Sequence, residues 1–335
     1  MLTDRNLNIS QYIAEAIELE MAADDRILVF GEDVGRLGGV FGTTRNLQRR
    51  FGSDRVRDTP IAEMGFVGMG VGLAMAGYRP IVEIMFVDFI GVCLEQIYNE
   101  MAKIPYMSGG RVSVPMVIKT AGGSIGDAAQ HSQTLWGLLA HLPGMQVVAP
   151  SCPYDYKGLL AGAIRDDAPT VFIEHKAHLL LKAEAFSHGA TVPQDAYVVP
   201  LGKANVVRRG SDVTVVSLSN CVNLSIEAAV ELATDGIEVE VVDLRSLVPL
   251  DTETVCESVA RTGCVVVVDE DYLRFGMSGE IVAAVVEQLG PQAVRGISRI
   301  ALPNVPIPAA LTLESEVLPS KQAIVSAVRS LAGSQ

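Results

Sequence analysis

The sequence predicts an α/β protein with two doubly wound domains, each built on a mostly parallel β-sheet. Short, unbroken apolar runs alternate along the chain with longer segments whose apolar residues recur at helical spacing. The composition agrees, because 49% of the 335 residues are hydrophobic but only 5% are aromatic. Such a balance favours compact α/β layers over an aromatic-rich sandwich.

The first half of the chain carries one complete set of alternating elements. Helical spacing predicts helices at 9–22, 89–103 and 154–165, and a further helix that begins near Glu63. The predicted strands are short apolar runs at 27–30, 55–59, 80–86, 114–120, 146–149 and 170–174. Because strands covered on both faces are apolar throughout, we expect a buried parallel sheet in a domain that spans residues 1–185.

A break in this alternation separates the two predicted domains. The stretch 183–194 contains polar residues, a glycine and a proline without a clear period, so we predict a linker at 186–202. Beyond it the pattern restarts, with strands at 213–217, 237–244 and 264–269 and helices at 222–235, 251–261, 278–289 and 320–331. We therefore expect a second, smaller βαβ domain over 203–335.

The charge and the cysteines narrow the class of protein. The chain has 26 basic and 39 acidic residues, a net charge of −13, which disfavours a nucleic-acid platform. The sequence contains no run of 18 uninterrupted apolar residues, so no membrane span is predicted, and residues 1–10 lack a targeting pattern. The five cysteines include no CxxC pair, so we expect buried thiols in a reducing, cytoplasmic protein.

Three glycines predict a close contact on the helix that begins near Glu63. Gly65, Gly68 and Gly72 fall three and four residues apart and so share one helical face. Each glycine costs a helix about 1 kcal/mol relative to alanine. Such a face is typical of a tight helix–helix contact, within the chain or across a subunit interface.

Polar residues at predicted strand ends are the candidates for chemistry. Glu32 follows the first strand, Glu63 lies in an apolar stretch at a helix start, and His131 follows a glycine-rich loop. A carboxyl in apolar surroundings has a raised pKa, which suits Glu63 to proton exchange. The alternatives are a helix-start acid that complements the dipole for Glu63 and a loop histidine that satisfies a backbone group for His131.

Motifs that bind phosphates or metals are missing from the sequence. It has no G-x-G-x-x-G opening a helix after a strand, no P-loop lysine and no G-x-S-x-G elbow. His175 and His178 have no third ligand nearby, so we expect no metal there. Gly126-Asp127 lacks the downstream asparagine that diphosphate–magnesium loops of this kind need.

Motifs in a fixed order give the chain a resemblance to a known family. It resembles the β subunits of the thiamine-diphosphate-dependent E1 component of 2-oxo acid dehydrogenase complexes, from about Asn8 to Leu331. The motifs that carry the resemblance are 30–34 (FGEDV), 58–63 (DTPIAE), 106–110 (YMSGG), 129–133 (AQHSQ), 163–167 (AIRDD) and 268–271 (VDED).

The resemblance implies a fold and an assembly. The fold would be a transketolase-like pyrimidine-binding domain followed by a transketolase C-terminal domain. The family works as an α2β2 heterotetramer, in which the α subunit holds the diphosphate and magnesium and the β subunit holds the aminopyrimidine. The missing diphosphate motif is then expected, because this chain would carry half of an active site.

The resemblance also implies roles for single residues. Glu63 would hydrogen-bond the N1′ nitrogen of the aminopyrimidine, Phe89 would stack on its face, and Glu32 would lie close to the cofactor in a proton relay. His131 would face the substrate and assist proton transfer or reductive acylation of the lipoyl group of the E2 acyltransferase. Residues that match the family's structural potassium site are Met116, Ala163, Ile164 and Asp166, whereas Ala168 departs from the usual asparagine.

The resemblance leaves the substrate open. It implies decarboxylation of a 2-oxo acid such as pyruvate first, with acetoin cleavage as the alternative and branched-chain 2-oxo acids also within the family. A more distant alternative is a non-catalytic scaffold or partner subunit. The presence of Glu63, Phe89 and His131 argues against a decayed site.

Overall fold

The computed structural model describes residues 5–333, and their contacts divide the chain into two compact units. Among the described residues, the first unit contains 5–122 and 139–201, and the second contains 123–138 and 202–333. Residues 123–138 thus belong by their contacts to the second unit, although they lie between elements of the first along the chain. Within the described range, no helix is long and apolar enough to cross a membrane.

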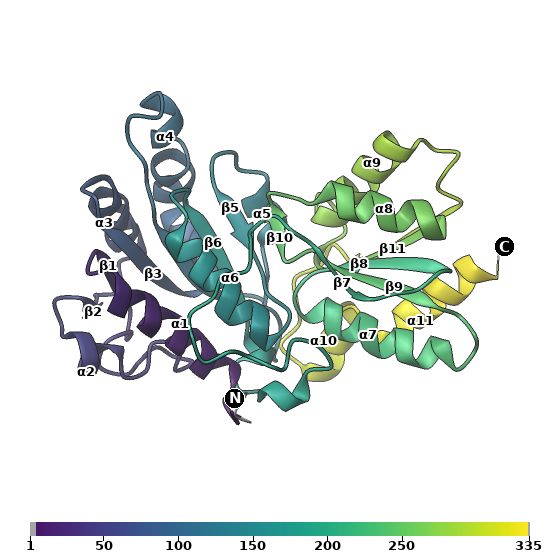
Figure 1. Ribbon diagram of the computed structural model, residues 1–335, viewed down its shortest axis with the longest axis horizontal. Helices are drawn as coiled ribbons and strands as arrows, with labels where there is room; N and C mark the ends of the chain where they lie inside the picture. The colour runs from purple at the N-terminus through teal and green to yellow at the C-terminus, as the bar shows by residue number, and fades with distance from the viewer. Residues whose placement is uncertain (1–4, 334–335) are drawn as a thin grey trace. The chain divides into compact units, whose positions relative to one another are not determined.

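The first unit is built on a parallel sheet (Figure 1). Its strands lie in the order β5-β6-β4-β3-β1-β2, and each neighbouring pair is parallel. Their bounds are β1 Ile27–Gly31, β2 Val56–Asp58, β3 Arg79–Phe86, β4 Val117–Gly122, β5 Gln146–Val148 and β6 Thr170–His175. The predicted α/β class with a mostly parallel sheet is confirmed.

Helices cover both faces of this sheet because alternate residues of each strand point to opposite sides. On one face, Val29 shares a buried core with apolar residues of α1 and α6. On the other face, Gly70 of α3 lies so close to Val82 that a Cβ at Gly70 would stand 2.8 Å from its Cγ2 atom. The helices of the unit are α1 Ile9–Ala23, α2 Leu47–Phe51, α3 Glu63–Met75, α4 Ile104–Met107 and α6 Pro153–Arg165. The short helix α5 spans Trp136–Ala140, and its first three residues belong to the second unit.

The segment after β3 differs from its prediction. A single α-helix was expected at 89–103, but the structure has a 3₁₀ helix η1 (Val87–Cys93), a π-helical turn η2 (Gln96–Met101) and the short α4. Cys93 donates its thiol to the carbonyl of Ile90, at 3.6 Å, and the Gln96 side chain packs against Gly68 of α3. Close packing against α3 therefore outweighs regular α-helical geometry here. Two further 3₁₀ turns are η3 (Lys176–His178) and η4 (Ala183–Ala185).

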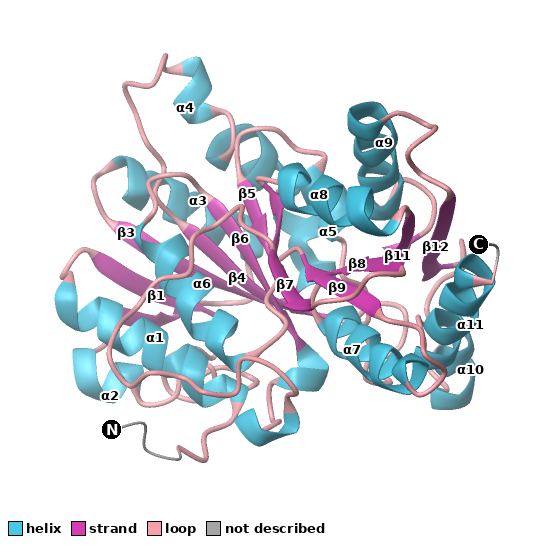
Figure 2. Ribbon diagram, turned by 45° about the vertical axis from the view of Figure 1, so that its right-hand side comes forward, coloured by secondary structure: helices cyan, strands magenta, loops and turns pink. Residues whose placement is uncertain are grey.

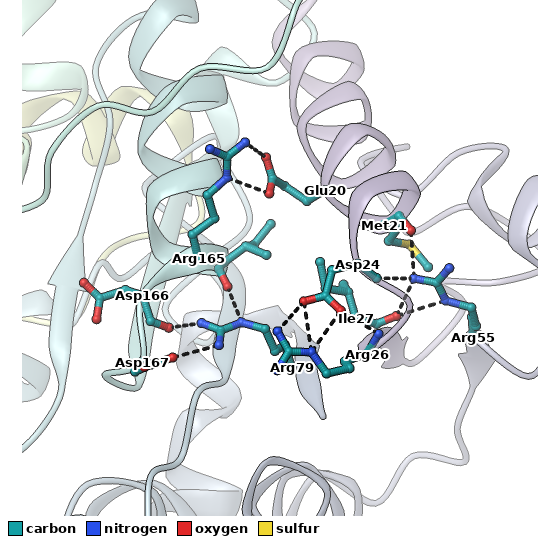
Figure 3. Close-up of polar contacts among 11 residues, drawn as sticks. Glu20, Met21, Asp24, Arg26, Ile27, Arg55, Arg79, Arg165, Asp166 and Asp167 are labelled. Carbon is teal, nitrogen blue, oxygen red and sulfur yellow. Dashed lines mark hydrogen bonds and ion pairs between the residues drawn. The ribbon is translucent and has the colours of Figure 1, made fainter. Parts of the chain in front are cut away.

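Arginine side chains join the loops and helices of the first unit (Figure 3). Arg165 of α6 makes a two-point ion pair with Glu20 of α1, at 2.8 and 2.9 Å. Arg55 donates to the backbone carbonyls of Met21, Asp24 and Ile27. Because each guanidinium reaches several acceptors at once, these contacts fix α1 against its neighbours.

The second unit has its own sheet, and the part of it that the structure describes contains five strands in the order β12-β11-β8-β9-β7. Only β7 runs antiparallel to its neighbour among these strands. The five strands are β7 Asn205–Arg208, β8 Val213–Ser217, β9 Val239–Asp243, β11 Cys264–Tyr272 and β12 Gly296–Leu302. A further short strand, β10 Ser246–Val248, is not one of these five. Neither β7 nor β12 was predicted, because both are half-exposed and lack an unbroken apolar run.

Helices lie on both sides of this second sheet (Figure 2). They are α7 Asn220–Ala233, α8 Thr252–Thr262, α9 Met277–Leu289, α10 Leu311–Val317 and α11 Lys321–Ala332. Apolar residues of α7 and α11 share one buried core with Val215, Val241 and Val266 of three adjacent strands. The alternating βα pattern predicted for the second domain is therefore present in the fold.

Candidate active site

Three of the predicted site residues lie at one edge of the first sheet. In the parallel register Gly31 stands opposite Glu83, so the carboxyl ends of β1 and β3 lie side by side. Glu32 follows β1 directly, and Phe89 lies in η1 just beyond β3. Glu63 is the first residue of α3, which follows β2. Open α/β sheets bind ligands at this edge, beyond the carboxyl ends of their strands.

The negative charge of Glu63 acts on the carboxyl group of Glu32. The pKa of Glu32 is raised by burial first and then by the negative charges of Glu63 and Asp33. Glu63 is only 7% exposed, and the Oε1 atom of Glu32 is buried without a hydrogen-bond partner. A buried carboxyl oxygen without a partner costs free energy, so Glu32 is poised to bind a hydrogen-bond donor or to hold a proton.

Phe89 belongs to a row of aromatic rings. Its ring meets that of Phe86 edge to face, with centroids 5.6 Å apart, and Phe86 meets Phe41 in the same way at 5.9 Å. The ammonium of Lys176 lies 5.2 Å from the centroid of the Phe86 ring. Edge-to-face contacts and this cation–π contact restrict the rings, so the half-buried Phe89 is held in one orientation.

A buried ion cluster beneath this edge was missed by the sequence analysis. Lys119 of β4 is 1% exposed, and its Nζ atom lies 2.8 Å from Glu83, 3.0 Å from Glu174 and 2.9 Å from Thr43. Glu83 and Lys119 face each other across β3 and β4. Opposite charges inside two apolar strand runs were the available signal, because a charged side chain is almost never fully buried unless it is paired.

The charges of this cluster shift its proton affinities. Burial raises the pKa of Glu174 to about 7, with Glu83 adding to the rise and Lys119 opposing it. Burial works to lower the pKa of Lys119, but the carboxylates of Glu174 and Glu83 outweigh it and the net pKa is raised. Lys119 therefore stays charged, and the cluster carries an excess of acidic groups below the sheet edge.

His131 belongs to the second unit and lies in the segment 123–138. It is half-buried, and its Nδ1 atom is 3.1 Å from the carbonyl oxygen of Asp127. Because a carbonyl oxygen only accepts, this bond places a proton on Nδ1, and in the neutral ring the lone pair lies on Nε2. In this state the ring can accept a proton at Nε2.

The four residues that match the family's potassium site are distributed around the end of α6 and the start of β4. Two of their carbonyl oxygens already accept hydrogen bonds from the guanidinium of Arg79, that of Ile164 at 2.9 Å and that of Asp166 (Figure 3). The carbonyl of Met116 accepts the amide of Thr170 at 3.0 Å. Arg79 also pairs with the carboxylate of Asp167, at 2.8 Å.

The outer face of α3 is covered only in part by the residues that the structure describes, because Gln96 lies against Gly68. Gly65 and Gly72 are exposed, and a Cβ atom at Gly72 would meet nothing within 4 Å. Met69 is 41% exposed and lines a cavity of about 370 Å³ together with residues of β1 and β2. Gly70, which the sequence analysis did not select, is the glycine that packs tightly against the sheet.

Comparison with known proteins identifies the fold and the family. Residues 5–180 match the transketolase pyrimidine-binding domain and residues 202–324 match the transketolase C-terminal domain. A solved structure described as a split-gene transketolase in an inactive beta4 tetramer shares the fold, with a TM-score of 0.78 and 23% identity over 98% of this chain and 99% of that one. The chain is therefore a two-domain protein of the transketolase type.

Relatives of nearly equal length define the family more closely. The chain is 45% identical to the acetoin:2,6-dichlorophenolindophenol oxidoreductase subunit beta of Cupriavidus necator, over 97% of both chains. It is 43% identical to the 2-oxoisovalerate dehydrogenase subunit beta of Bacillus subtilis, over 97% of this chain and 99% of the relative. The pyruvate dehydrogenase E1 component subunit beta of Bacillus subtilis is 40% identical, over 96% and 98%. This chain belongs to the family of E1 beta subunits of thiamine-diphosphate-dependent 2-oxo acid and acetoin dehydrogenases.

Proposed function

We propose that this chain forms the aminopyrimidine half of a thiamine diphosphate site in an α2β2 E1 enzyme. The enzyme decarboxylates a 2-oxo acid such as pyruvate and passes the acyl group to the lipoyl domain of an E2 acyltransferase. The single observation that carries the proposal is the electrostatic effect of Glu63, at the start of α3, on Glu32, which follows β1 directly at the sheet edge. The α subunit contributes the diphosphate and magnesium side of the site.

The residues at this edge fit an aminopyrimidine ring. The ring offers hydrogen-bonding nitrogens and a flat aromatic face. Glu63 supplies a buried carboxyl, Glu32 supplies a buried oxygen without a partner, and Phe89 supplies a ring fixed by its aromatic neighbours. Thiamine diphosphate, when bound, would supply the carbanion chemistry that the reaction needs.

Glu63 exchanges a proton with a ring nitrogen of the pyrimidine. It lies in the first turn of α3 and is 7% exposed, so its surroundings largely exclude water. Burial first, and then the charge of Glu63, raise the pKa of Glu32, so Glu32 holds a proton to a higher pH than an ordinary glutamate does. A carboxyl neighbour that retains its proton can return one to Glu63, which makes Glu32 a relay.

His131 transfers a proton on the substrate side. The Asp127 carbonyl holds Nδ1–H, and Nε2 is the nitrogen that accepts a proton in the neutral ring. The same group can donate that proton during acyl transfer to the lipoyl group.

A potassium ion on the carbonyls of Met116, Ala163, Ile164 and Asp166 is a separate part of this proposal. The ion would compete for two of these carbonyl oxygens with the guanidinium of Arg79, which already donates hydrogen bonds to them. The test compares the melting temperature of the chain in potassium chloride and in choline chloride at equal ionic strength. A rise with potassium alone supports the ion, whereas equal melting temperatures assign its structural role to Arg79.

Acetoin cleavage is the second candidate function. The identity of 45% to an acetoin oxidoreductase beta subunit, against 40% to a pyruvate dehydrogenase beta subunit, favours it. Both reactions need the same proton exchange at Glu63, so the α subunit, which shares the pocket, contributes to the choice. The five cysteines, all free and buried, suit a reducing compartment such as the cytoplasm for either function.

The experiment co-expresses the chain with an α subunit and purifies the complex. Turnover is then measured with a dye acceptor on pyruvate, 2-oxoisovalerate and acetoin, with and without thiamine diphosphate and magnesium. Cofactor-dependent turnover of a 2-oxo acid supports the main proposal, and preference for acetoin selects the second. A complex that binds the α subunit but turns over none of the three would leave a non-catalytic partner subunit as the better description.

A further inference from the structure

The second unit buries an unusual set of acidic side chains. Asp269, Glu270 and Asp271 end the apolar run of β11, and Glu314 lies in α10. Their exposed fractions are 0%, 5%, 7% and 4%. A buried carboxylate is costly unless it accepts hydrogen bonds, so the identity of its donors shows what each acid does.

On one side, two of these acids hold the backbone that leads to His131. We name residues 123–137 the His131 loop. The Ser124 amide donates to Oε1 of Glu270 at 3.1 Å, and the Gly126 amide donates to Oε1 of Glu314 at 3.0 Å. Bonds from an amide to a carboxylate are shorter and stronger than neutral ones.

On the other side, the same strand end holds the backbone that leaves His131. The Thr134 hydroxyl donates to the carbonyl of Glu270 at 2.9 Å, and the Gly137 amide donates to Oδ2 of Asp271, also at 2.9 Å. The indole of Trp136 donates to Oδ1 of Asp269 at 2.8 Å. Both arms of the loop are therefore fixed to β11.

The His131 loop needs these external bonds because it has little regular structure of its own. Ala128 and Leu135 adopt left-handed backbone angles, with φ of 65° and 50°. Such angles cost a residue other than glycine on the order of 1–3 kcal/mol. Within the loop, the Gly123 amide donates to the carbonyl of Gln133 at 2.9 Å, which closes its base but does not reach the tip.

We propose that Glu314 and Glu270 are positioning residues, whose buried carboxylates hold the amides of Gly126 and Ser124 and thereby set the direction of the His131 ring. The bond from Nδ1 of His131 to the carbonyl of Asp127 completes the link, because Asp127 adjoins Gly126. This inference rests on the proposed role of His131 in proton transfer. It assigns a task to the VDED motif at 268–271, which the sequence analysis used only for the resemblance.

The test uses Glu314 in the assembled α2β2 enzyme. Glu314→Ala removes the acceptor for the Gly126 amide, and Glu314→Gln retains an acceptor oxygen. Glu316→Ala, an exposed acid on the same helix, is the matched control. We expect Glu314→Ala to lower kcat by about 10- to 100-fold with little change in KM, because misplacing a catalytic group by about 1 Å costs that order of rate. Glu314→Gln should recover most of this loss, and Glu316→Ala should show none.

Two further measurements separate the possible failures. Hydrogen exchange at the Gly126 amide should accelerate in Glu314→Ala and return toward the wild-type rate in Glu314→Gln. An unchanged rate in Glu314→Ala would overturn the positioning contact itself. In a double-variant cycle, Glu314→Ala should add almost nothing to the loss caused by His131→Ala. If the fold-losses in kcat of the two single variants multiply in the double variant, Glu314 acts independently of His131, and the proposal is overturned. Full activity of His131→Ala alone would instead refute the proposed role of His131, and with it the catalytic effect assigned here to Glu314.

Discussion

His131 holds its Nδ1 atom 3.1 Å from the carbonyl oxygen of Asp127, four residues earlier in the same loop. The carbonyl can only accept, so the contact selects the tautomer with a proton on Nδ1. Selective ¹⁵N labelling of histidine should therefore show a protonated Nδ1 and an unprotonated Nε2 in the neutral ring. Signals typical of the opposite tautomer would contradict this geometry and remove Nε2 as the proton acceptor.

Glu63→Gln should abolish most catalysis while leaving the assembly intact. Glutamine retains the shape and can hydrogen-bond the pyrimidine, but it cannot exchange a proton. General acid–base groups contribute roughly 10²- to 10⁴-fold, so activity should fall by about that factor. The direct measurement is hydrogen–deuterium exchange at the C2 position of the cofactor in the assembled enzyme. Wild-type exchange in the variant would leave Glu63 with a dipole-capping role only, and the exposed Glu100→Gln serves as the control.

Phe89→Ala should weaken cofactor binding more than it slows turnover. The loss of stacking and of buried area should cost about 1–3 kcal/mol of binding free energy. Calorimetric titration of the α2β2 enzyme with thiamine diphosphate and magnesium measures this loss of binding free energy. Turnover at saturating cofactor measures any separate effect on the rate of the reaction. Phe89→Leu retains apolar area without an aromatic face, so its cofactor affinity should lie between those of the wild type and Phe89→Ala. An unchanged cofactor affinity in Phe89→Ala would place this ring in the packing around Phe86 alone.

Gly72→Leu should disturb subunit assembly without harming the isolated chain. Gly72 is exposed, and a side chain there has open space within this chain. Leucine also suits a helix better than glycine, by somewhat less than the ~1 kcal/mol that separates glycine from alanine, so the urea midpoint of the chain alone should not fall. If α3 packs against a partner helix through its glycine face, sedimentation should show reduced assembly. Ala283→Leu, on an exposed helix position in the second unit, is the control, and normal assembly of Gly72→Leu would exclude the glycine face from the interface.

Asp269→Asn should flatten the pH dependence of stability in the second unit. Burial first, and then the charge of Asp271, raise the pKa of Asp269 to about 7 from its ordinary 3.8. The folded state therefore binds more protons than the unfolded state between pH 3.8 and 7, and its stability falls as the pH rises through that window. Asparagine cannot ionise and still offers an oxygen to Trp136, so the variant should be more stable than wild type at pH 8.

Urea unfolding at pH 5 and pH 8 measures this difference. Trp136 is the single tryptophan of the sequence and donates to Asp269, so its fluorescence reports on this site. A wild-type chain that is equally stable at both pH values, or a variant that is less stable at pH 8, would contradict the prediction.

The sequence by itself determined the α/β class, the predicted core strands and three residues at one sheet edge. Apolar runs such as 27–30 and 213–217 could be read directly, because burial on both faces of a strand leaves a local trace. Glu32 and Glu63 could be selected because one follows a predicted strand and the other begins a helix, and parallel strands bring their carboxyl ends to one edge. Phe89 was selected through the resemblance to a known family.

Only the tertiary structure decided which distant residues meet. Lys119 pairs with Glu174 across β4 and β6, and the His131 loop joins the second unit through Glu270 and Glu314. The ion pair depends on the order of the strands in the sheet. The loop contacts join residues that lie more than a hundred positions apart, which no local sequence pattern records. The π-helical turn η2, whose Gln96 side chain lies against Gly68 of α3, likewise differs from the regular helix that the spacing of its own residues predicts. Local patterns report whether a side chain is buried, and the fold determines what it is buried against.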